Sequence, residues 1–179
     1  MTHTGLLLAA GNSIRFGADD KLLADFRGEP LIAHAARAMR DAALDDRVAV
    51  VTSDAVAALL DGFRIIRIAP GQQSDSLRAG LEAVGDPDLL LIALGDMPLV
   101  TDEHLDAVMQ RATDGHIAAS HDGTTALPPA CVPRAMIPAL STLKGDQGAG
   151  RLLQDLPQHS LVHAPDLLID VDTQDDLTR

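Results

Sequence analysis

Short apolar runs alternate with amphipathic segments through the first half of the chain. The runs predict buried strands at residues 6–9, 47–52, 64–68 and 89–94. Between them, apolar side chains at helical spacing predict helices at 31–39, 54–60 and 76–84. Strands that alternate with helices are typical of a three-layer α/β/α, Rossmann-like fold around a mostly parallel sheet.

The pattern is less regular beyond Asp96. It predicts a helix at 102–111, strands at 116–120 and 125–132, a proline-interrupted helical stretch from Pro133, a glycine-rich loop at 145–150, a short helix from Arg151, and closing strands at 161–163 and 167–169. We therefore expect the C-terminal part of the sheet to be mixed. The length of 179 residues predicts a single domain spanning residues 1–179.

Composition narrows the classes of function. The net charge of −12 argues against a duplex nucleic-acid binder, whose affinity depends on a basic face. The single cysteine, Cys131, excludes an internal disulfide and is typical of a buried small side chain in a reducing compartment. Because no apolar run approaches the roughly 20 residues that span a bilayer, we expect a cytoplasmic protein without membrane contact. Aromatic residues are only 2% of the chain, which predicts an aliphatic core.

The loop after the first predicted strand carries the strongest chemical signal. Gly11 permits a tight turn, Ser13 adds a hydroxyl donor, and Arg15 and Lys21 supply two cations. Backbone N–H groups in such a turn can line an anion-sized concavity, so the loop suits a phosphate chain. It matches neither the P-loop nor the G-x-G-x-x-G dinucleotide fingerprint. The alternative is an ordinary strand-to-loop turn whose charges face water.

Acidic residues follow two other apolar runs. Asp96, in Gly95-Asp96-Met97-Pro98, comes directly after the predicted strand at 89–94, and Gly95 allows close approach of the backbone. Mg²⁺ is commonly held by one or two carboxylates together with substrate phosphates and waters. The second carboxylate is expected from Asp170 or Asp172, which period-two alternation would place on one side of a strand. The alternatives are that Asp96 stabilises its own turn and that Asp172 caps a terminal helix.

A third loop joins the predicted strand at 64–68 to the helix that follows. Gly71 permits close approach of a ligand, and Ser76 lies near the first turn of the helix, where N–H donors are unpaired. This loop is therefore expected to hold the base or ribose of a nucleotide. In open α/β sheets ligands bind outside the carboxyl ends of the strands, where all three loops are expected to meet. The seven histidines lack the spacing of a zinc site.

Several motifs together resemble the MobA-like nucleotidyltransferases over nearly the whole chain. They are Leu8-Ala9-Ala10-Gly11-x-Ser13-x-Arg15-Phe16-Gly17 with Lys21, Ser76-Leu77-x-x-Gly80-Leu81, Gly95-Asp96-Met97-Pro98, Gly145-Asp146-Gln147-Gly148-Ala149 and Asp170-Val171-Asp172-Thr173. Within that family the chain is most similar to the molybdenum cofactor cytidylyltransferase (MocA-like) branch, because of Ala9-Ala10-Gly11 and of aspartate at both ends of Asp170-x-Asp172.

The resemblance implies a nucleotide-diphospho-sugar transferase-like fold and transfer of CMP from CTP to the phosphate of molybdopterin, with release of pyrophosphate. It implies that Leu8, Ala9, Ala10 and Gly11 contact the nucleotide together with Ser13, Gly71 and Gly95, that Arg15 and Lys21 bind the triphosphate, that Ser76 binds the nucleoside, and that Asp96 with Asp170 or Asp172 binds Mg²⁺. Arg15, Lys21 and Asp96 would be the catalytic residues. A molybdoenzyme or its chaperone would be the protein partner.

Two other functions remain open at this point. One is transfer of GMP, or of CMP, to a different phosphorylated acceptor. The other is a non-catalytic nucleotide-binding or cofactor-binding module, since a fold alone does not establish activity.

Overall fold

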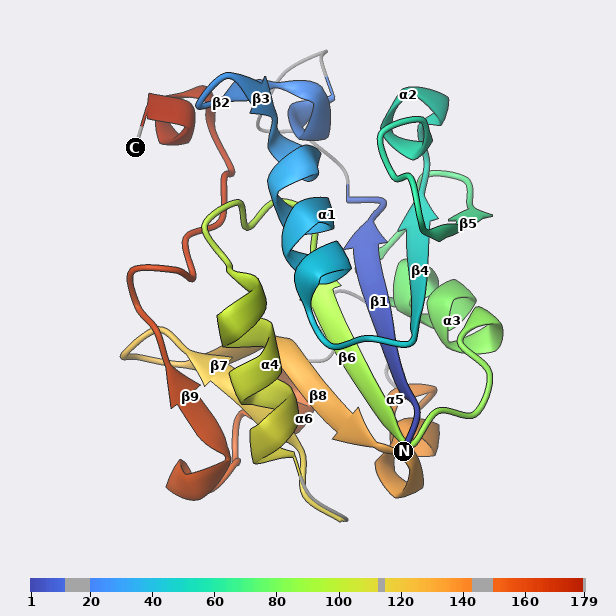
Figure 1. Cartoon of the computed structure of the whole chain (residues 1–179), viewed down its shortest axis with the longest axis vertical. Coiled ribbons are helices and arrows are strands. Elements are labelled where there is room, and N and C mark those ends of the chain that lie inside the picture. Colours follow the sequence, from blue (N-terminus) through green and yellow to red (C-terminus); the bar gives the residue numbers. More distant parts are fainter. Residues whose placement is uncertain (12–19, 113–114, 143–149, 179) are drawn as a thin grey trace.

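A seven-stranded sheet organises the chain in the computed structural model, which describes residues 1–11, 20–112, 115–142 and 150–178 (Figure 1). Its strands are β1 (His3–Ala9), β4 (Asp46–Val51), β5 (Arg64–Arg67), β6 (Leu89–Leu94), β7 (Ala118–His121), β8 (Ala126–Pro133) and β9 (Leu161–His163), in the order β5-β4-β1-β6-β8-β7-β9. Two short strands, β2 (Asp25–Phe26) and β3 (Glu29–Pro30), pair separately.

The sheet is parallel on one side and mixed on the other. β1 pairs in parallel with both β4 and β6, and β5 extends this half. β8 runs antiparallel to both of its neighbours, β6 and β7, and a short turn joins it to β7. In that turn the Asp122 carboxylate accepts hydrogen bonds from the backbone N–H of Thr124 and Thr125 at 2.7 and 2.8 Å. The predicted mostly parallel sheet with a mixed C-terminal part is confirmed.

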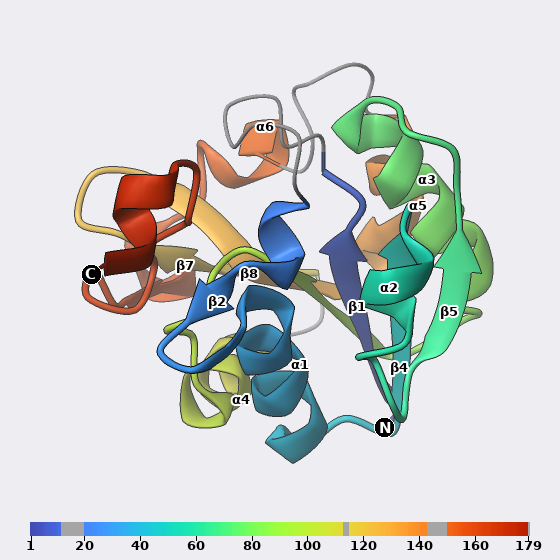
Figure 2. The same ribbon diagram turned by 90° about the horizontal axis from the view of Figure 1, so that it is seen from above.

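Helices cover both faces of the sheet (Figure 2). α1 (Leu31–Asp41) and α4 (Asp102–Arg111) lie on one face, and α3 (Gln73–Ala83), α5 (Ile137–Leu140) and α6 (Gly150–Leu153) lie on the other. Alternate side chains of each strand feed two cores: Leu7 and Leu91 pack beneath α1 and α4, whereas Leu6 and Leu90 pack beneath α3. This arrangement is the predicted three-layer fold.

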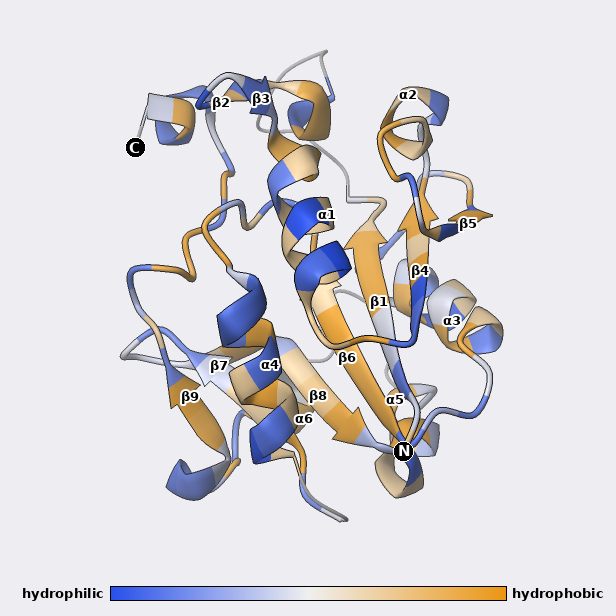
Figure 3. Ribbon diagram, viewed as in Figure 1, coloured by the Kyte–Doolittle hydropathy of each residue, from blue (hydrophilic) through white to orange (hydrophobic). Residues whose placement is uncertain are grey.

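The cores are aliphatic, as composition predicted. Phe26 is the aromatic member of the buried hydrophobic set among the described residues. Figure 3 shows hydrophobic central strands and hydrophilic outer surfaces on α1 and α4. Within the described part of the chain, none of the helices has the length and apolarity needed to cross a bilayer.

Several element boundaries agree with the sequence pattern, and one element was predicted wrongly. β6 and α4 begin and end at the predicted residues, while α2 (Asp54–Ala57) is shorter than predicted and α3 begins three residues earlier, at Gln73. Residues 167–169 form a turn and irregular chain instead of a strand. Leu168 is 6% exposed and packs into the core beneath α1 and α4, so burial explains the apolar triplet without strand pairing. The period-two argument for Asp170 and Asp172 therefore has no strand to support it.

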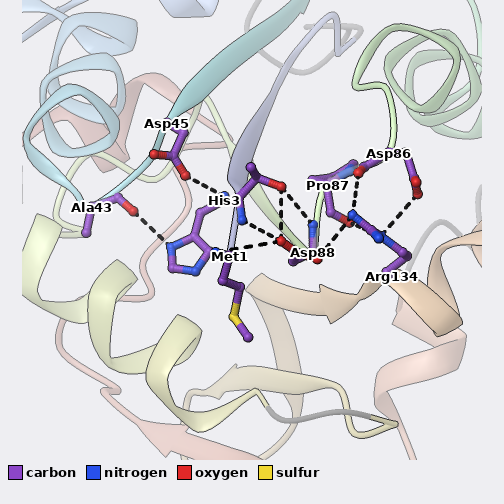
Figure 4. A network of polar contacts seen from close by, with 9 residues as sticks. Met1, His3, Ala43, Asp45, Asp86, Pro87, Asp88 and Arg134 are labelled. Carbon is purple, nitrogen blue, oxygen red and sulfur yellow. Dashed lines mark hydrogen bonds and ion pairs between the residues drawn. The ribbon is translucent and has the colours of Figure 1, made fainter.

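A polar network fastens the amino ends of the central strands (Figure 4). The backbone N–H of Thr2 donates to Asp88 Oδ2 at 2.6 Å, and that of His3 donates to Asp45 Oδ2 at 2.7 Å. Arg134, after β8, pairs with Asp88 at 3.1 Å and with Asp86 at 3.2 Å. The hydrogen bond from Thr2 lowers the pKa of Asp88, and Arg134 lowers it further. These contacts tie β1, β6 and β8 together at the end of the sheet opposite the candidate site.

Candidate functional site

A pocket of about 570 Å³ opens at the carboxyl ends of β1 and β6. It is bounded by the turn after β1, the short 3-10 helix η1 (Lys21–Leu23), the first turn of α3 and the residues that follow β6. The lining residues are Leu8, Ala9, Ala10, Gly11, Lys21, Leu22, Gly71, Gln72, Gln73, Asp75, Ser76, Leu94 and Asp96. The three loops expected at this edge of the sheet therefore do meet.

Close backbone packing forms the floor of the pocket. The N–H of Gly95 donates to Leu8 O at 3.0 Å, which continues the pairing of β6 with β1 into the loop. A Cβ at Gly95 would lie 2.7 Å from Ile32 Cδ1 and 3.4 Å from Ala9 Cβ. Because a side chain does not fit there, glycine lets the β6 loop approach β1 and brings Asp96 to the pocket.

The start of α3 forms one wall. Asp75 reaches back so that its Oδ2 accepts from the N–H of Gln72 at 3.0 Å, which begins the helix. A Cβ at Gly71 would lie 2.8 Å from the same oxygen, so glycine leaves room for this cap. Ser76, one turn into the helix, is 4% exposed and lines the pocket. The wall thus presents the first turn of a helix and polar side chains, an arrangement suited to a polar ligand.

Lys21 lies at the centre of the charged part of the site. Its ammonium donates to Asp96 Oδ2 at 2.8 Å, to the backbone oxygen of Val171 at 3.0 Å and to Asp172 Oδ1 at 3.4 Å. Lys21 is 8% exposed. Burial acts to lower the pKa of Lys21, but the carboxylates of Asp96 and Asp172 outweigh it, and the pKa is raised above its ordinary value. Lys21 therefore stays charged inside the pocket.

Asp170 adds a third carboxylate to this charged cluster. Desolvation raises its pKa, and the negative charges of Asp172 and Asp96 raise it further. Among the described residues, Lys21 is in contact with two of these carboxylates, those of Asp96 and Asp172. Carboxylates gathered this closely favour cations nearby.

One oxygen of Asp96 supports a metal site. Asp96 Oδ1 is buried and has no hydrogen-bond partner among the residues that the structure describes. A buried carboxylate oxygen without a partner is costly, and coordination to a cation would satisfy it. In the same described ranges, no group of three or more His, Cys, Asp or Glu side chains is placed to hold a metal ion. The residues present thus fit an ion that takes one or two carboxylates and completes its shell with phosphate and water, as Mg²⁺ does.

Most residues predicted from the sequence lie at this pocket. Eight of them line it: Leu8, Ala9, Ala10, Gly11, Lys21, Gly71, Ser76 and Asp96. Gly95 lies behind Asp96, and Asp170 and Asp172 lie beyond Lys21 in the irregular segment that follows β9. Ser13 and Arg15 lie outside the described residues, as does the Gly145–Ala149 motif.

The described contacts of Asp96 and Asp172 differ from the two structural alternatives, in which Asp96 stabilises its own turn and Asp172 caps a terminal helix. Asp96 bonds through its side chain to Lys21, rather than to its own turn. At the C-terminal helix η5 (Gln174–Thr178) the capping carboxylate is that of Asp176, which accepts from the N–H groups of Asp172 and Thr173 at 3.2 and 2.9 Å. Asp172 is thereby left to face Lys21.

Sequence reasoning missed several lining residues, namely Leu22, Gln72, Gln73, Asp75 and Leu94. One signal was available for part of this set. Gln72 and Asp75 stand three residues apart ahead of the apolar positions of α3, the spacing of a capping box. That spacing marks the start of the helix at Gln73 and places both side chains at the helix end that faces the pocket.

Curated relatives match part of the chain. A molybdenum cofactor guanylyltransferase of Pseudomonas putida KT2440 is 35% identical over 118 residues, which are 64% of this chain and 60% of the relative. A 3-deoxy-manno-octulosonate cytidylyltransferase of Anaeromyxobacter sp. Fw109-5 is 36% identical over 111 residues, 58% of this chain and 45% of the relative. The chain thus spans less than two thirds of the length of these proteins.

Solved structures match the whole chain. Rv0371c of Mycobacterium tuberculosis H37Rv covers 100% of this chain and 97% of its own, with a TM-score of 0.86 and 26% identity. A structure of the same protein described as a complex with manganese has a TM-score of 0.83 at 26% identity and the same coverage. Residues 5–162 match the MobA-like NTP transferase domain. The chain therefore belongs to the MobA-like NTP transferase family.

Proposed function

We propose that this protein is a divalent-metal-dependent nucleotidyltransferase that transfers CMP from CTP to the phosphate of molybdopterin and releases pyrophosphate. One observation carries the proposal: Lys21 and Asp96 meet at 2.8 Å in a pocket that the turn after β1 and the N-terminus of α3 also line. A cation, a helix N-terminus and a carboxylate oxygen without a partner in the described part of the chain suit a metal-bound triphosphate.

The pocket lining also indicates where the nucleophile comes from. Ser76 is the hydroxyl residue in the described lining, and no histidine stands in that lining to activate it. A phosphorylated acceptor brings its own anionic oxygen, which forms a bond to the α-phosphorus of the nucleotide while the bond to the leaving pyrophosphate breaks. The protein then has to hold the two substrates in line and neutralise charge.

Each described residue has a place in this scheme. The turn at Leu8–Gly11 and the start of α3 with Gly71 and Ser76 bind the nucleoside, and Lys21 binds the phosphate chain. Asp96 would hold the metal together with Asp170 or Asp172, and Mg²⁺ or Mn²⁺ bound there would supply positive charge to the α-phosphate and the leaving pyrophosphate. Arg15 is assigned to the triphosphate on the sequence motif alone.

The choice of cytidine depends on the Ala9-Ala10-Gly11 motif and on aspartate at both Asp170 and Asp172. Transfer of GMP is the second candidate, favoured by the 35% identity to a protein named as a guanylyltransferase. A relative named for cytidylyl transfer is matched at a similar identity of 36%, so overall likeness does not separate the two bases. The acceptor phosphate is proposed to be that of molybdopterin because the motifs are most similar to the molybdenum cofactor branch.

Pyrophosphate release tests the proposal. It is measured with CTP, GTP, ATP and UTP in turn, with and without molybdopterin and with Mg²⁺, Mn²⁺ or EDTA. We expect release with CTP only when both molybdopterin and a divalent cation are present. Faster release with GTP would replace the cytidine assignment by the guanosine one. Nucleotide binding without release in any combination would indicate a non-catalytic module.

A further inference from the structure

We infer that the Lys21 ammonium occupies the position of the divalent cation in the metal-free protein, so that metal and Lys21 compete for the same oxygens. The inference depends on the metal site of the proposed function and goes beyond it. It gives Lys21 two alternating partners, the aspartates in the empty site and the triphosphate in the loaded one. Nucleotide binding and metal binding then become coupled through a single side chain.

The contacts of Lys21 are those expected of a cation in a ligand shell. Its ammonium lies 2.8 Å from a carboxylate oxygen of Asp96, 3.0 Å from the carbonyl oxygen of Val171 and 3.4 Å from a carboxylate oxygen of Asp172. Carboxylate and carbonyl oxygens are the ligands that hard divalent cations take in proteins. They come from the loop after β6 and from the segment after β9, which converge on Lys21.

The oxygen cluster has a support that does not involve Lys21. The N–H of Val171 donates to the backbone oxygen of Asp96 at 3.0 Å, which joins the two segments directly. Val171 is 1% exposed and packs in the core beneath α1 and α4. The oxygens are therefore held close together whether or not the ammonium lies between them, so a different cation can take its place.

The charges around Lys21 explain why replacement of its ammonium by a divalent cation is favourable. Asp96 and Asp172 both contact the Lys21 ammonium, and Asp96 Oδ1 still has no hydrogen-bond partner within the described residues. A divalent cation neutralises more of this charge but is repelled by the ammonium while Lys21 stays in place. A triphosphate offers Lys21 an alternative partner of opposite charge, which removes the repulsion as the metal arrives.

Mn²⁺ binding without nucleotide tests the inference directly. The dissociation constant is measured from the electron paramagnetic resonance signal of free Mn²⁺ for the wild-type protein and for K21M, which removes the charge and keeps an unbranched apolar side chain. We expect K21M to bind Mn²⁺ at least ~10-fold more tightly, because a unit charge a few ångströms away acts strongly in a partly buried site. An unchanged or weaker affinity of K21M would overturn the inference.

Two control variants separate the local effect from net charge. K21R keeps a positive charge on a differently shaped side chain and should not bind Mn²⁺ more tightly than the wild type does. R64M removes a cation at the remote, exposed pair of Arg64 with Asp46 and should also leave the affinity unchanged. If R64M gained as much affinity for Mn²⁺ as K21M, the inference would be overturned, because the change in net charge would then explain both results.

D96N distinguishes failure of the inference from failure of the proposed function. If D96N abolishes Mn²⁺ binding while K21M binds like the wild type, the metal site stands and the exchange is wrong. If D96N binds Mn²⁺ as the wild type does, both are wrong. Displacement of the Lys21 ammonium by a metal can also be measured without K21M, so that a folding defect of that variant plays no part.

The chain contains two lysines, Lys21 and Lys144, so the ¹⁵N ammonium signals are easily assigned with K144R. A hydrogen-bonded, buried ammonium is protected from solvent exchange, and we expect the Lys21 signal to disappear when Mg²⁺ saturates the site. Persistence of that signal at saturating Mg²⁺ would overturn the inference.

Discussion

Lys21 Nζ and Asp96 Oδ2 lie 2.8 Å apart, although 75 residues separate them in the sequence. Lys21 is the first residue of the short helix η1, and Asp96 follows β6 closely. Because β1 and β6 are adjacent parallel strands, their carboxyl ends meet and carry both side chains into one pocket. The cation and the carboxylate that the proposed chemistry needs are thus held together by strand pairing.

Asp96→Asn should lower the rate of nucleotidyl transfer by about 100-fold or more, the scale of removing one group that stabilises charge in the transition state. The amide keeps the shape of the side chain but loses the charge that binds a cation. Steady-state pyrophosphate release measures the effect, with far-UV circular dichroism to confirm the fold. Asp61→Asn, at an exposed position before β5, is the matched control and should retain the wild-type rate. An unimpaired D96N would remove Asp96 from the metal site.

Gly80→Ala should destabilise the protein although alanine favours helices. A Cβ at Gly80 would lie 2.6 and 2.7 Å from the two terminal carbons of Leu6, which is fully buried in β1. Overpacking of this kind costs about 1–3 kcal/mol, against about 1 kcal/mol gained from helix propensity. Urea denaturation measures the difference.

The clash with Leu6 in G80A should also push α3 away from β1. Because the start of α3 lines the pocket, we expect KM for the nucleotide to rise. Leu6→Val combined with G80A should lose less stability than the two single changes added together, since they relieve one clash. Glu82→Ala, on the exposed side of α3, is the control. A more stable G80A would show that Leu6 moves aside without cost.

Acid should weaken the fold through His104. Burial lowers the pKa of His104, whose Nε2 lies 2.8 Å from Ser120 Oγ; that hydroxyl in turn donates to Pro129 O at 2.8 Å. The unfolded chain then binds a proton at about pH 6.5 while the folded chain resists it, so stability is lost as pH falls below that value. We expect the melting temperature of the wild type to fall between pH 7.5 and 5, as differential scanning calorimetry would show.

His104→Gln keeps a side-chain donor for Ser120 but does not titrate. The difference in melting temperature between wild type and H104Q should therefore shrink, or reverse in sign, as the pH falls. A difference that stays constant with pH would mean that protonation of His104 is not coupled to folding.

Cys131 should not react in the native state. Burial raises the pKa of its thiol to about 12, and the side chain is 0% exposed in β8. The thiolate is the reactive species, so iodoacetamide at pH 8 should leave the folded protein unmodified and alkylate it fully in guanidinium chloride. Intact-mass spectrometry distinguishes the two. Rapid stoichiometric modification without denaturant would show that β8 opens readily.

Elements with strong local signals were predictable from the sequence. The helix at 102–111 was predicted to the residue because Thr101 caps it, with Oγ1 accepting from the N–H of His104, and acidic residues occupy its first turn. The apolar run of β6 was likewise predicted to the residue. The triplet at 167–169 was predicted wrongly because its apolar character reflects packing of Leu168 against the core, a tertiary contact that leaves no local signature.

The position of the candidate site was predictable from the sequence, but part of its lining was not. A glycine turn, a cation and an aspartate at the ends of apolar runs were expected at one edge because parallel strands bring their carboxyl ends together. Gln72 and Gln73 were not chosen, because polar residues in a loop carry no periodicity that tells which of them face a cavity. The contact of Lys21 with Asp172 was not expected either, since the segment after β9 is irregular.

The sequence by itself determined the layered α/β architecture, through the order of its apolar runs, amphipathic segments and glycine loops. It also determined the edge of the sheet at which ligands are expected. Both depend on periodicity and on the handedness of strand connections. Only the tertiary structure decided which side chains share the pocket and that Lys21 lies among Asp96, Val171 and Asp172. Such contacts join segments 75 to 151 residues apart, and no local pattern in the chain specifies a distance between them.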